Sequence, residues 1–339
     1  MSAEHCDESI LLDCERDRIN DPLLRNLDLS YFGLFYPYGF PLKVTSNSST
    51  VIEALRKSFG RFQRASDAPP IEFEVTVEGD ETGPMPGQPL FRTRRHLLTL
   101  AYDSEHFGTC DFEAGYAHLR ISPRALRDLP ALRYFFLDAM ALSLICERHL
   151  VPVHAACIAL NGSGALLCGR STAGKSSLAY ACARRGFTYV CDDGSFLVRS
   201  ASDRTVTGNC HSIRFRPSAA ELFPELQDIP AIRRANGKMA IEVPVRTLGL
   251  DRLSERCRVD HIVFLNRQPA GPARLQPSST ERARTEFVGV LAYGRDASIT
   301  DQQAALERLL DVEILELTYS DPDSAADALE ALLLNRGVA

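Results

Sequence analysis

A phosphate-binding pattern next to an apolar segment constrains this chain more than any other feature. Residues 169–176 read GRSTAGKS and fit the pattern G-x-x-x-x-G-K-[ST]. The apolar run Ala165–Cys168 before them is short enough for a buried strand, and a helix is predicted from about Lys175 to Arg185. This strand–loop–helix order favours nucleotide binding over the alternative, a glycine-rich turn without a ligand.

The residue types in this loop suit a triphosphate. Glycines let the backbone curl so that successive N–H groups point at phosphate oxygens, and the N-terminal end of the helix adds partial positive charge. Lys175 is expected to neutralise the β- and γ-phosphates, and Ser176 to place its hydroxyl on Mg²⁺. The residues predicted to bind ATP are Gly169, Arg170, Ser171, Thr172, Ala173, Gly174, Lys175, Ser176 and Ser177.

Two adjacent aspartates follow at a distance that suits the same site. Phe187–Cys191 is predicted as a strand, and Asp192 and Asp193 come directly after it, 17 and 18 residues beyond Lys175. One carboxylate can hold Mg²⁺ while the other accepts a proton from an attacking hydroxyl. The alternative is a solvated Asp-Asp-Gly turn, but beside a phosphate-binding loop we favour the functional interpretation.

Four short motifs occur in sequence over residues 150–200: His154-Ala155-Ala156, Gly169-x-Ser171-x-x-Gly174-Lys175-Ser176, Arg185-Gly186 and Asp192-Asp193. In this order they resemble the catalytic domain of HPr kinase/phosphorylase and the HPr-kinase-related proteins. The resemblance continues weakly through residues 236–238 and a predicted strand at 260–265. It covers about half of the chain and does not extend to residues before about 145.

The resemblance implies an α/β P-loop kinase domain of the HPr kinase/carboxykinase-like type, a phosphotransferase that uses ATP and Mg²⁺. It implies catalytic roles for Lys175, His154, Asp192 and Asp193. We expect Asp192 to be the base, and Ser176 and Asp193 to hold the metal, although the reverse division of the aspartates stays open. His154 is expected to lie near the aspartates and to hydrogen-bond one carboxylate, with a structural histidine at a strand start as the alternative.

The sequence leaves the acceptor open. We favour a serine kinase acting on a protein or peptide; the alternatives are a small-molecule kinase and an ATP-binding sensor or scaffold that hydrolyses slowly or not at all. A decarboxylating carboxykinase is disfavoured because the extra ligand set of such enzymes is missing. Five basic residues have two interpretations: they contact the phosphates or the acceptor, or they are simply exposed at the surface. They are Arg214, Arg216, Arg233, Arg234 and Lys238.

Charge and cysteine usage narrow the class of protein. The formal net charge is −6 and no basic stripe stands out, which argues against binding to nucleic acid or to a membrane surface. Ten cysteines include no C-x-x-C pair, and several lie in apolar stretches, which is typical of a reduced, cytoplasmic protein. The most apolar window, 134–151, contains Asp138, Glu147 and Arg148, so a buried helix is predicted there and no membrane span. Whether the chain forms a homo-oligomer stays open.

We expect three segments: a polar lead-in at 1–28, an N-terminal α+β domain with an antiparallel sheet at 29–149, and the catalytic domain at 150–339. The N-terminal domain is predicted to hold a helix capped by Thr50 and Glu53, a strand at 71–78 with its carboxylates facing outward, a loop at 79–89, further strands at 96–102, 106–112 and 115–121, and a helix at 130–149. The catalytic domain is predicted to open with a strand at 153–160 and the hairpin turn Asn161-Gly162. A helix-like segment at 219–223, a helix at 300–310, a strand at 312–317 and a helix at 322–335 are expected to follow.

Overall fold

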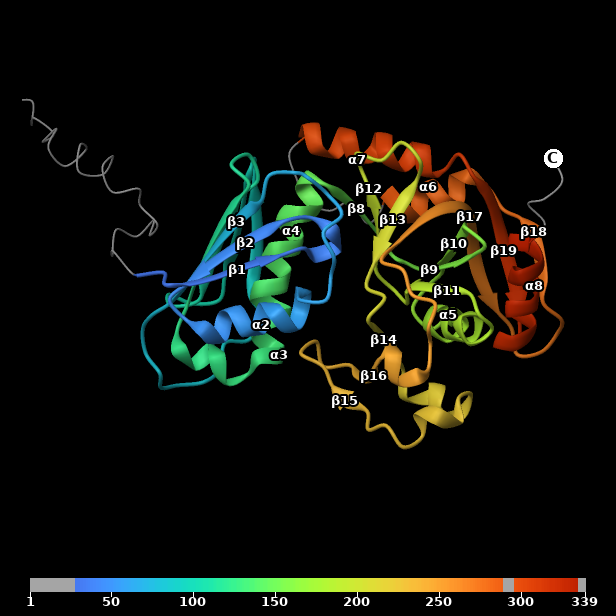
Figure 1. Ribbon diagram of the computed structural model, residues 1–339, viewed down its shortest axis with the longest axis horizontal. Helices are drawn as coiled ribbons and strands as arrows, with labels where there is room; N and C mark the ends of the chain where they lie inside the picture. The colour runs from blue at the N-terminus through green and yellow to red at the C-terminus, as the bar shows by residue number, and fades with distance from the viewer. Residues whose placement is uncertain (1–27, 289–295, 335–339) are drawn as a thin grey trace, which may run out of the picture.

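The computed structural model describes residues 28–288 and 296–334, so the predicted lead-in falls almost entirely outside the described residues. The chain folds into two lobes, each with its own β-sheet and helices, and the fold is mixed α/β (Figure 1).

The N-terminal lobe is built on a seven-stranded sheet in the order β1-β2-β3-β7-β6-β5-β4. Its strands are β1 (Tyr31–Phe35), β2 (Leu42–Ser46), β3 (Ile71–Val77), β4 (Leu90–Arg94), β5 (Leu97–Ala101), β6 (Phe107–Asp111) and β7 (Tyr116–Ile121). Strands β4 to β7 form the expected antiparallel meander, and β4 is a strand that the sequence did not predict. However, β3 lies parallel to both β2 and β7, so the sheet is mixed and the prediction of an antiparallel sheet was wrong at this point.

The central place of β3 also changes what its side chains face. A strand between two neighbours in a covered sheet is buried on both sides, and here Glu74 and Thr76 are only 9% and 1% exposed. The hydroxyl of Tyr116 donates to Glu74 Oε2 over 2.7 Å, which compensates for the burial of the carboxylate. The expected outward carboxylate face therefore holds for Glu72, whereas Glu74 is buried and Glu78 is half-buried.

Helices cover this sheet. They are α2 (Ser49–Phe59), whose N-cap is Ser48 and not the predicted Thr50, and a continuous run made of α3 (Leu129–Leu132), one π-helical turn η3 (Arg133–Leu137) and α4 (Asp138–Arg148). Among the described residues, the run Leu129–Arg148 is the one helical stretch whose length and mean hydropathy of 1.5 would suit a membrane span. Core helices pass the same test, and Phe136, Met140 and Leu144 of this run are fully buried in the core of the lobe.

The C-terminal lobe contains a larger sheet whose central strand is β17 (Arg256–Arg267), longer than the predicted strand at 260–265. Its first residues pair with β13, and the remainder lies parallel to β10 on one side and β19 on the other. The other strands are β8 (Leu150–Val153), β9 (Ala155–Leu160), β10 (Ser163–Cys168), β11 (Thr188–Cys191), β12 (Ser195–Val198), β13 (Thr205–Gly208), β18 (Arg274–Pro277) and β19 (Glu313–Tyr319). The predicted strand 153–160 is thus interrupted at His154, because β8 pairs with β12 whereas β9 pairs with β10 and β11.

Two pairs of helices sandwich this sheet. On one face α5 (Lys175–Arg184) and α8 (Pro322–Leu334) pack in a core that includes Leu178 and Leu329. On the other face α6 (Thr280–Val288) and α7 (Asp296–Leu309) pack in a core that includes Phe287 and Leu309. Successive strand residues alternate between these two cores, as the pleat requires. The predicted helix at 300–310 is α7, which begins four residues earlier.

A small three-stranded sheet extends from this lobe toward the N-terminal one (Figure 1). It consists of β14 (Ser212–Phe215), β16 (Met239–Pro244) and β15 (Ile232–Arg233). Both lobes also contain short 3₁₀ turns between their strands and helices. These are η1 (Pro37–Gly39), η2 (Pro123–Arg127), η4 (Pro217–Glu221), η5 (Pro224–Leu226) and η6 (Val245–Leu248). The helix-like segment expected at 219–223 is the 3₁₀ turn η4.

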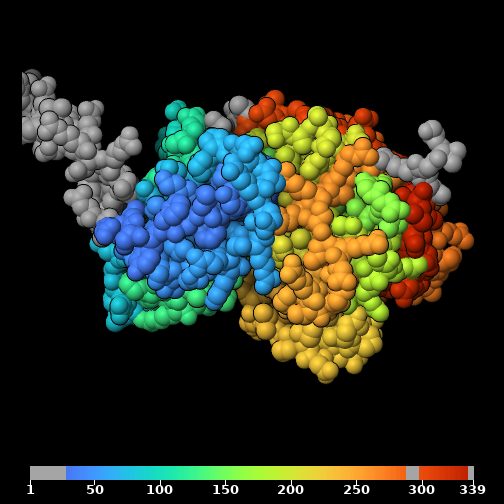
Figure 2. All heavy atoms as spheres, in the orientation of Figure 1, coloured from blue at the N-terminus to red at the C-terminus, as the bar shows by residue number. Residues whose placement is uncertain are grey.

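The two lobes meet over a broad face, where the blue and cyan residues of the N-terminal lobe touch the yellow and orange segments (Figure 2). The ring of Tyr38 lies 4.8 Å from that of Phe62 and 4.5 Å from that of Phe196, measured between centroids. The amide of Gln63 donates to the carboxylate of Glu255. Aromatic packing and polar contacts thus join the lobes directly.

Candidate active site

One sheet edge gathers the residues that the motifs singled out. The turn Asn161-Gly162 has φ angles of 49° and 83°, as a two-residue hairpin requires, and pairs β9 with β10 as predicted. Strand β9 is antiparallel to both β10 and β11. His154, which directly precedes β9, therefore lies beside the end of β10, where the phosphate-binding loop begins, and beside the end of β11, where Asp192 and Asp193 follow.

The loop itself is held in a conformation that few residues adopt. Gly174, the N-cap of α5, has φ = 95°, and a Cβ there would lie 2.3 Å from the hydroxyl oxygen of Tyr319. That hydroxyl donates to the carbonyl of Ala173 over 2.7 Å. Thr172 also has a positive φ of 86°, which is unusual for a β-branched residue. Such strain tends to persist where the surroundings hold a loop in shape for a ligand.

Lys175 points into the middle of this arrangement. Its side chain is 6% exposed, and Nζ donates to the carbonyl of Gly169 over 2.8 Å. The same Nζ lies 3.2 Å from Nε2 of His154 and 3.5 Å from Oδ1 of Asp193. Because lysine has donors only, Nε2 of His154 accepts in this contact and the ring proton is assigned to Nδ1.

The two aspartates occupy different environments. Asp192 is buried; its Oδ2 accepts from the hydroxyl of Ser176 at 3.3 Å and from the backbone N–H of Arg214 at 2.9 Å. Burial raises the pKa of Asp192, an effect that the positive charge of Arg214 opposes. The side chain of Asp193 is 57% exposed, and its Oδ1 lies 3.5 Å from Nε2 of His154. The structure thus brings together the four predicted catalytic residues and Ser176.

A cleft of about 710 Å³ opens over these residues. Of the predicted ATP-binding residues, seven line it: Arg170, Ser171, Thr172, Gly174, Lys175, Ser176 and Ser177. Gly169 and Ala173 contribute through the carbonyl contacts described above. The first-turn amides of α5 have no partners within the helix, so the N-terminus of α5 can bind an anion at this wall.

The residues of the cleft can hold a magnesium ion only together with a bound nucleotide. No group of three or more His, Cys, Asp or Glu side chains within 28–288 and 296–334 is arranged to hold a metal. Mg²⁺ usually keeps several waters and binds through one or two carboxylates plus substrate phosphates. Ser176 and its partner Asp192, with Asp193 nearby, supply that number of oxygen ligands.

Four of the five basic candidates line the cleft as well, namely Arg214, Arg216, Arg234 and Lys238, whereas Arg233 does not. Arg216 reaches the loop directly, since its Nη2 donates to Ser171 Oγ over 2.8 Å. Three relevant residues were missed: Tyr134 and Arg267 of the cleft wall, and Tyr319 behind the loop. Arg267 and Tyr319 pair at the carboxyl ends of β17 and β19, a position that a longer predicted β17 would have indicated.

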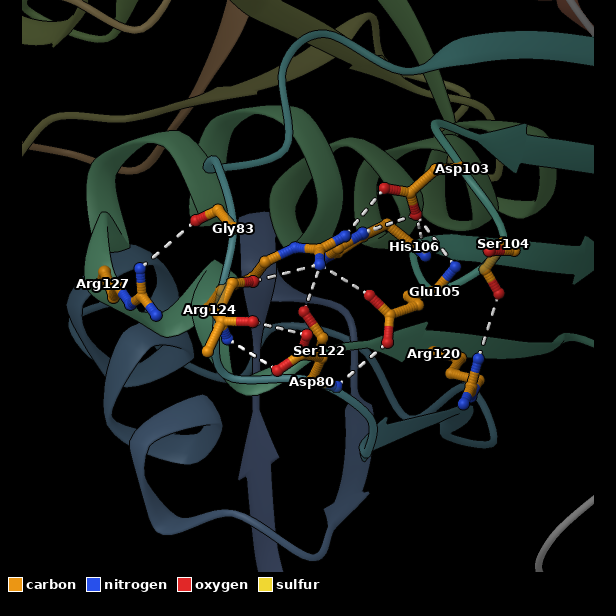
Figure 3. A network of polar contacts seen from close by, with 11 residues as sticks. Asp80, Gly83, Asp103, Ser104, Glu105, His106, Arg120, Ser122, Arg124 and Arg127 are labelled. Atoms are coloured by element: carbon orange, nitrogen blue, oxygen red, sulfur yellow. Dashed lines mark hydrogen bonds and ion pairs between the residues drawn. The ribbon is translucent and has the colours of Figure 1, made fainter.

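A second polar arrangement in the N-terminal lobe has the order of a serine-hydrolase triad but not its accessibility. Asp103 Oδ1 lies 2.7 Å from His106 Nδ1, and His106 Nε2 lies 3.0 Å from Ser122 Oγ (Figure 3). Both His106 and Ser122 are fully buried, so no substrate can reach the hydroxyl. Arg124 pairs with Asp103 and donates to the carbonyl of Thr82, so the network fastens the loop after β3 to η2.

Comparisons with known proteins add little to this geometry. No family model and no curated protein sequence matches the chain. Among solved structures, the chain is similar to an HPr(Ser) kinase/phosphatase from Coxiella burnetii, with 17% sequence identity and a TM-score of 0.31, over 54% of this chain and 94% of that chain. At that identity the likeness concerns the fold alone, and at that TM-score no functional conclusion rests on it.

Proposed function

We propose that the protein is a Mg²⁺·ATP-dependent kinase that transfers the γ-phosphoryl group to a hydroxyl, with a serine of a protein or peptide as the favoured acceptor and a small molecule as the alternative. The observation that carries this proposal is the pair of contacts at one cleft wall, Ser176 with Asp192 and Lys175 with Asp193. Phosphoryl transfer needs charge neutralisation and positioning more than covalent help, and these side chains provide both.

The contact between Lys175 and Asp193 supports a simple sequence of events. Before the nucleotide binds, Nζ of Lys175 neutralises the carboxylate of Asp193 at 3.5 Å. A triphosphate in the loop attracts Nζ more strongly, because it carries several negative charges at close range. Asp193 then loses its cation and remains beside His154, exposed to the cleft and able to accept a proton from the acceptor hydroxyl.

The environment of Asp192 supports the other role. Its Oδ2 already accepts from Ser176, the residue expected to place a hydroxyl on the metal. Bound Mg²⁺ would neutralise phosphate charge, and Asp192 and Ser176 would hold it. The contacts therefore favour the reverse of the division expected from the sequence, with Asp193 as the base and Asp192 on the metal side.

The test incubates the protein with γ-labelled ATP, Mg²⁺ and a panel of serine peptides and small hydroxyl compounds, and measures transfer of the label. Lys175→Ala should lose nucleotide binding, measured by calorimetry. Asp193→Asn should bind Mg²⁺·ATP normally but transfer roughly 10²- to 10⁴-fold more slowly, the usual size of a general-base effect. Asp192→Asn should instead raise the Mg²⁺ concentration needed for half-maximal rate. Asp251→Asn, an exposed aspartate outside the cleft, is the matched control.

Transfer by Lys175→Ala at the rate of the unmodified chain would remove the loop from the mechanism. Tight ATP binding without transfer to any compound, and with slow hydrolysis equal in Asp193→Asn, would indicate a nucleotide sensor. If the Mg²⁺ concentration needed for half-maximal rate changed in Asp193→Asn and not in Asp192→Asn, the roles expected from the sequence would hold, with Asp192 as the base and Asp193 on the metal.

A further inference from the structure

The cleft has a second wall that the phosphate-binding loop does not account for. Tyr134 lies in the π-helical turn η3 of the N-terminal lobe, and its side chain is 42% exposed. The guanidinium carbon of Arg234 lies 5.9 Å from the centroid of the Tyr134 ring. Single π-helical turns occur frequently at functional sites. The turn between β15 and β16 lies beside the N-terminal lobe (Figure 1), and its residues Arg234 and Lys238 line the cleft.

This wall carries two basic side chains, Arg234 and Lys238, that form no salt bridge within the described residues. Arg214 forms an ion pair with Glu242, at 3.4 Å between Nε and Oε2. Within residues 28–288 and 296–334, no carboxylate forms an ion pair with Arg234 or Lys238. Arg234 is half-buried, and burial together with the charge of Arg214 lowers its pKa. An unpaired, half-buried guanidinium in a cleft is a ready partner for an anion.

Arg234 lines the same cleft as Asp192 and Asp193 but belongs to a different element from the phosphate-binding loop. The loop has cations of its own for the triphosphate, namely Lys175 and Arg216, and the latter donates to Ser171 of the loop. The acceptor hydroxyl has to approach the aspartates, and Tyr134, Arg234 and Lys238 line a part of the same cleft that the loop does not form.

We propose that Tyr134 of the N-terminal lobe, together with Arg234 and Lys238 of the β15–β16 turn, forms the acceptor subsite, and that the acceptor carries a carboxylate next to its hydroxyl. Arg234 pairs with the carboxylate through its planar fork, the ring of Tyr134 holds the guanidinium in place, and Lys238 adds charge at the rim. This inference rests on the proposed kinase function for the identity of the ligand as acceptor. The carboxylate can belong to a free hydroxy acid or to an acidic residue beside a serine in a peptide.

The chain contains no tryptophan, so Tyr134→Trp introduces a single tryptophan beside Arg234. The Tyr134→Trp variant, saturated with Mg²⁺ and a non-hydrolysable ATP analogue, is titrated with two matched pairs of probes. The first pair is L-serine and L-serinamide; the second is a blocked Glu-Ser-Glu peptide and its Gln-Ser-Gln counterpart. We expect a saturable change in emission with one of the two carboxylate probes, which identifies the source, and an affinity roughly ten- to hundred-fold weaker for its amide counterpart.

Adding Arg234→Gln to the Tyr134→Trp chain should abolish most of that preference, whereas adding Arg233→Gln should not. Arg233 is the matched control because it lies in the same hairpin, is exposed and does not line the cleft. Equal binding of carboxylate and amide probes, or an unchanged preference after Arg234→Gln and Lys238→Gln together, would overturn the inference. So would a loss of nucleotide affinity in Arg234→Gln as large as the loss of probe affinity, because the arginine would then serve the triphosphate.

The same probes, incubated with the unmodified chain, γ-labelled ATP and Mg²⁺, separate this inference from the proposed function. Carboxylate-selective binding that depends on Arg234, without transfer of label to any probe, would remove the kinase activity and leave the anion subsite in place. Transfer of label to the carboxylate and amide probes at equal rates would do the opposite.

Discussion

The half-buried carboxylate of Asp138 lies in the same helical run as Tyr134. Asp138 begins α4, directly after the π-helical turn. Burial raises its pKa to about 6, although a hydrogen bond with Ser58 and the charge of Arg133 act in the opposite direction. The hydroxyl of Ser58 also accepts from Arg133 Nε over 2.7 Å, so these groups form one chain of contacts. The folded protein therefore binds a proton at Asp138 more tightly than the unfolded chain does.

This difference predicts how stability depends on pH. A carboxyl whose folded pKa is raised contributes stability that is complete below its ordinary pKa of 3.8 and is lost as pH rises through about 6. Asp138→Asn removes the charge, so at pH 8 we expect its free energy of unfolding to exceed that of the unmodified chain by about 1–3 kcal/mol. Near pH 4.5, which still lies above the ordinary pKa, the difference should fall to about a third of its value at pH 8.

Urea unfolding at both pH values provides the measurement, with Asp67→Asn, an exposed aspartate, as control. An equal difference at both pH values would show that Asp138 does not titrate in this range.

At the scale of elements, the Asp103–His106–Ser122 network joins a loop to the strands around it. Asp103 and His106 flank the turn before β6, and Ser122 follows β7. Arg124 extends the network to Asp103, Glu105 and the carbonyl of Thr82. Because the segment 79–89 has neither helix nor strand, its position depends on such side-chain contacts.

Ser122→Ala should therefore destabilise the lobe without affecting the cleft. The substitution leaves Nε2 of His106 buried without its partner, which costs about 1–3 kcal/mol. We expect a lower urea midpoint and faster proteolysis within 79–89, while nucleotide affinity stays unchanged. Ser104→Ala, an exposed neighbour, is the control, and identical behaviour of the two variants would contradict a stabilising role for the network.

Two elements show what a local sequence pattern can predict and what it cannot. The Asn161-Gly162 hairpin was predicted correctly because both turn residues need positive φ, a local requirement that these residue types meet. The partner of β3 was not predictable in the same way. An alternating pattern defines a strand but says nothing of which strands it pairs with, and burial of Glu74 depends on that pairing.

At the scale of the whole molecule, the interface between the lobes determines the shape of the cleft. Tyr38 contributes twice, through its ring contacts with Phe62 and Phe196 and through its carbonyl, which accepts from Thr207 Oγ1 over 3.4 Å. If the lobes separate, Tyr134 leaves the wall that it shares with Arg234.

Tyr38→Ala should loosen this interface. Loss of a packed aromatic ring costs about 3–5 kcal/mol, and we expect calorimetry to show unfolding in two transitions where the unmodified chain shows one. Tyr38→Phe keeps the ring and serves as control. Indistinguishable thermal profiles for the two variants would show that the ring does not couple the lobes.

The sequence by itself determined the features that depend on neighbouring residues. The loop at 169–176, the helix after it and the aspartates at the end of β11 follow from local requirements for glycine, periodicity and turn residues. Only the tertiary structure decided which distant residues share their cleft. Tyr134, Arg234 and Arg267 come from separate elements, and His154 approaches Lys175 only because β9 runs antiparallel to its two neighbours. Such approaches depend on the packing of many side chains at once, and no short stretch of sequence contains that information.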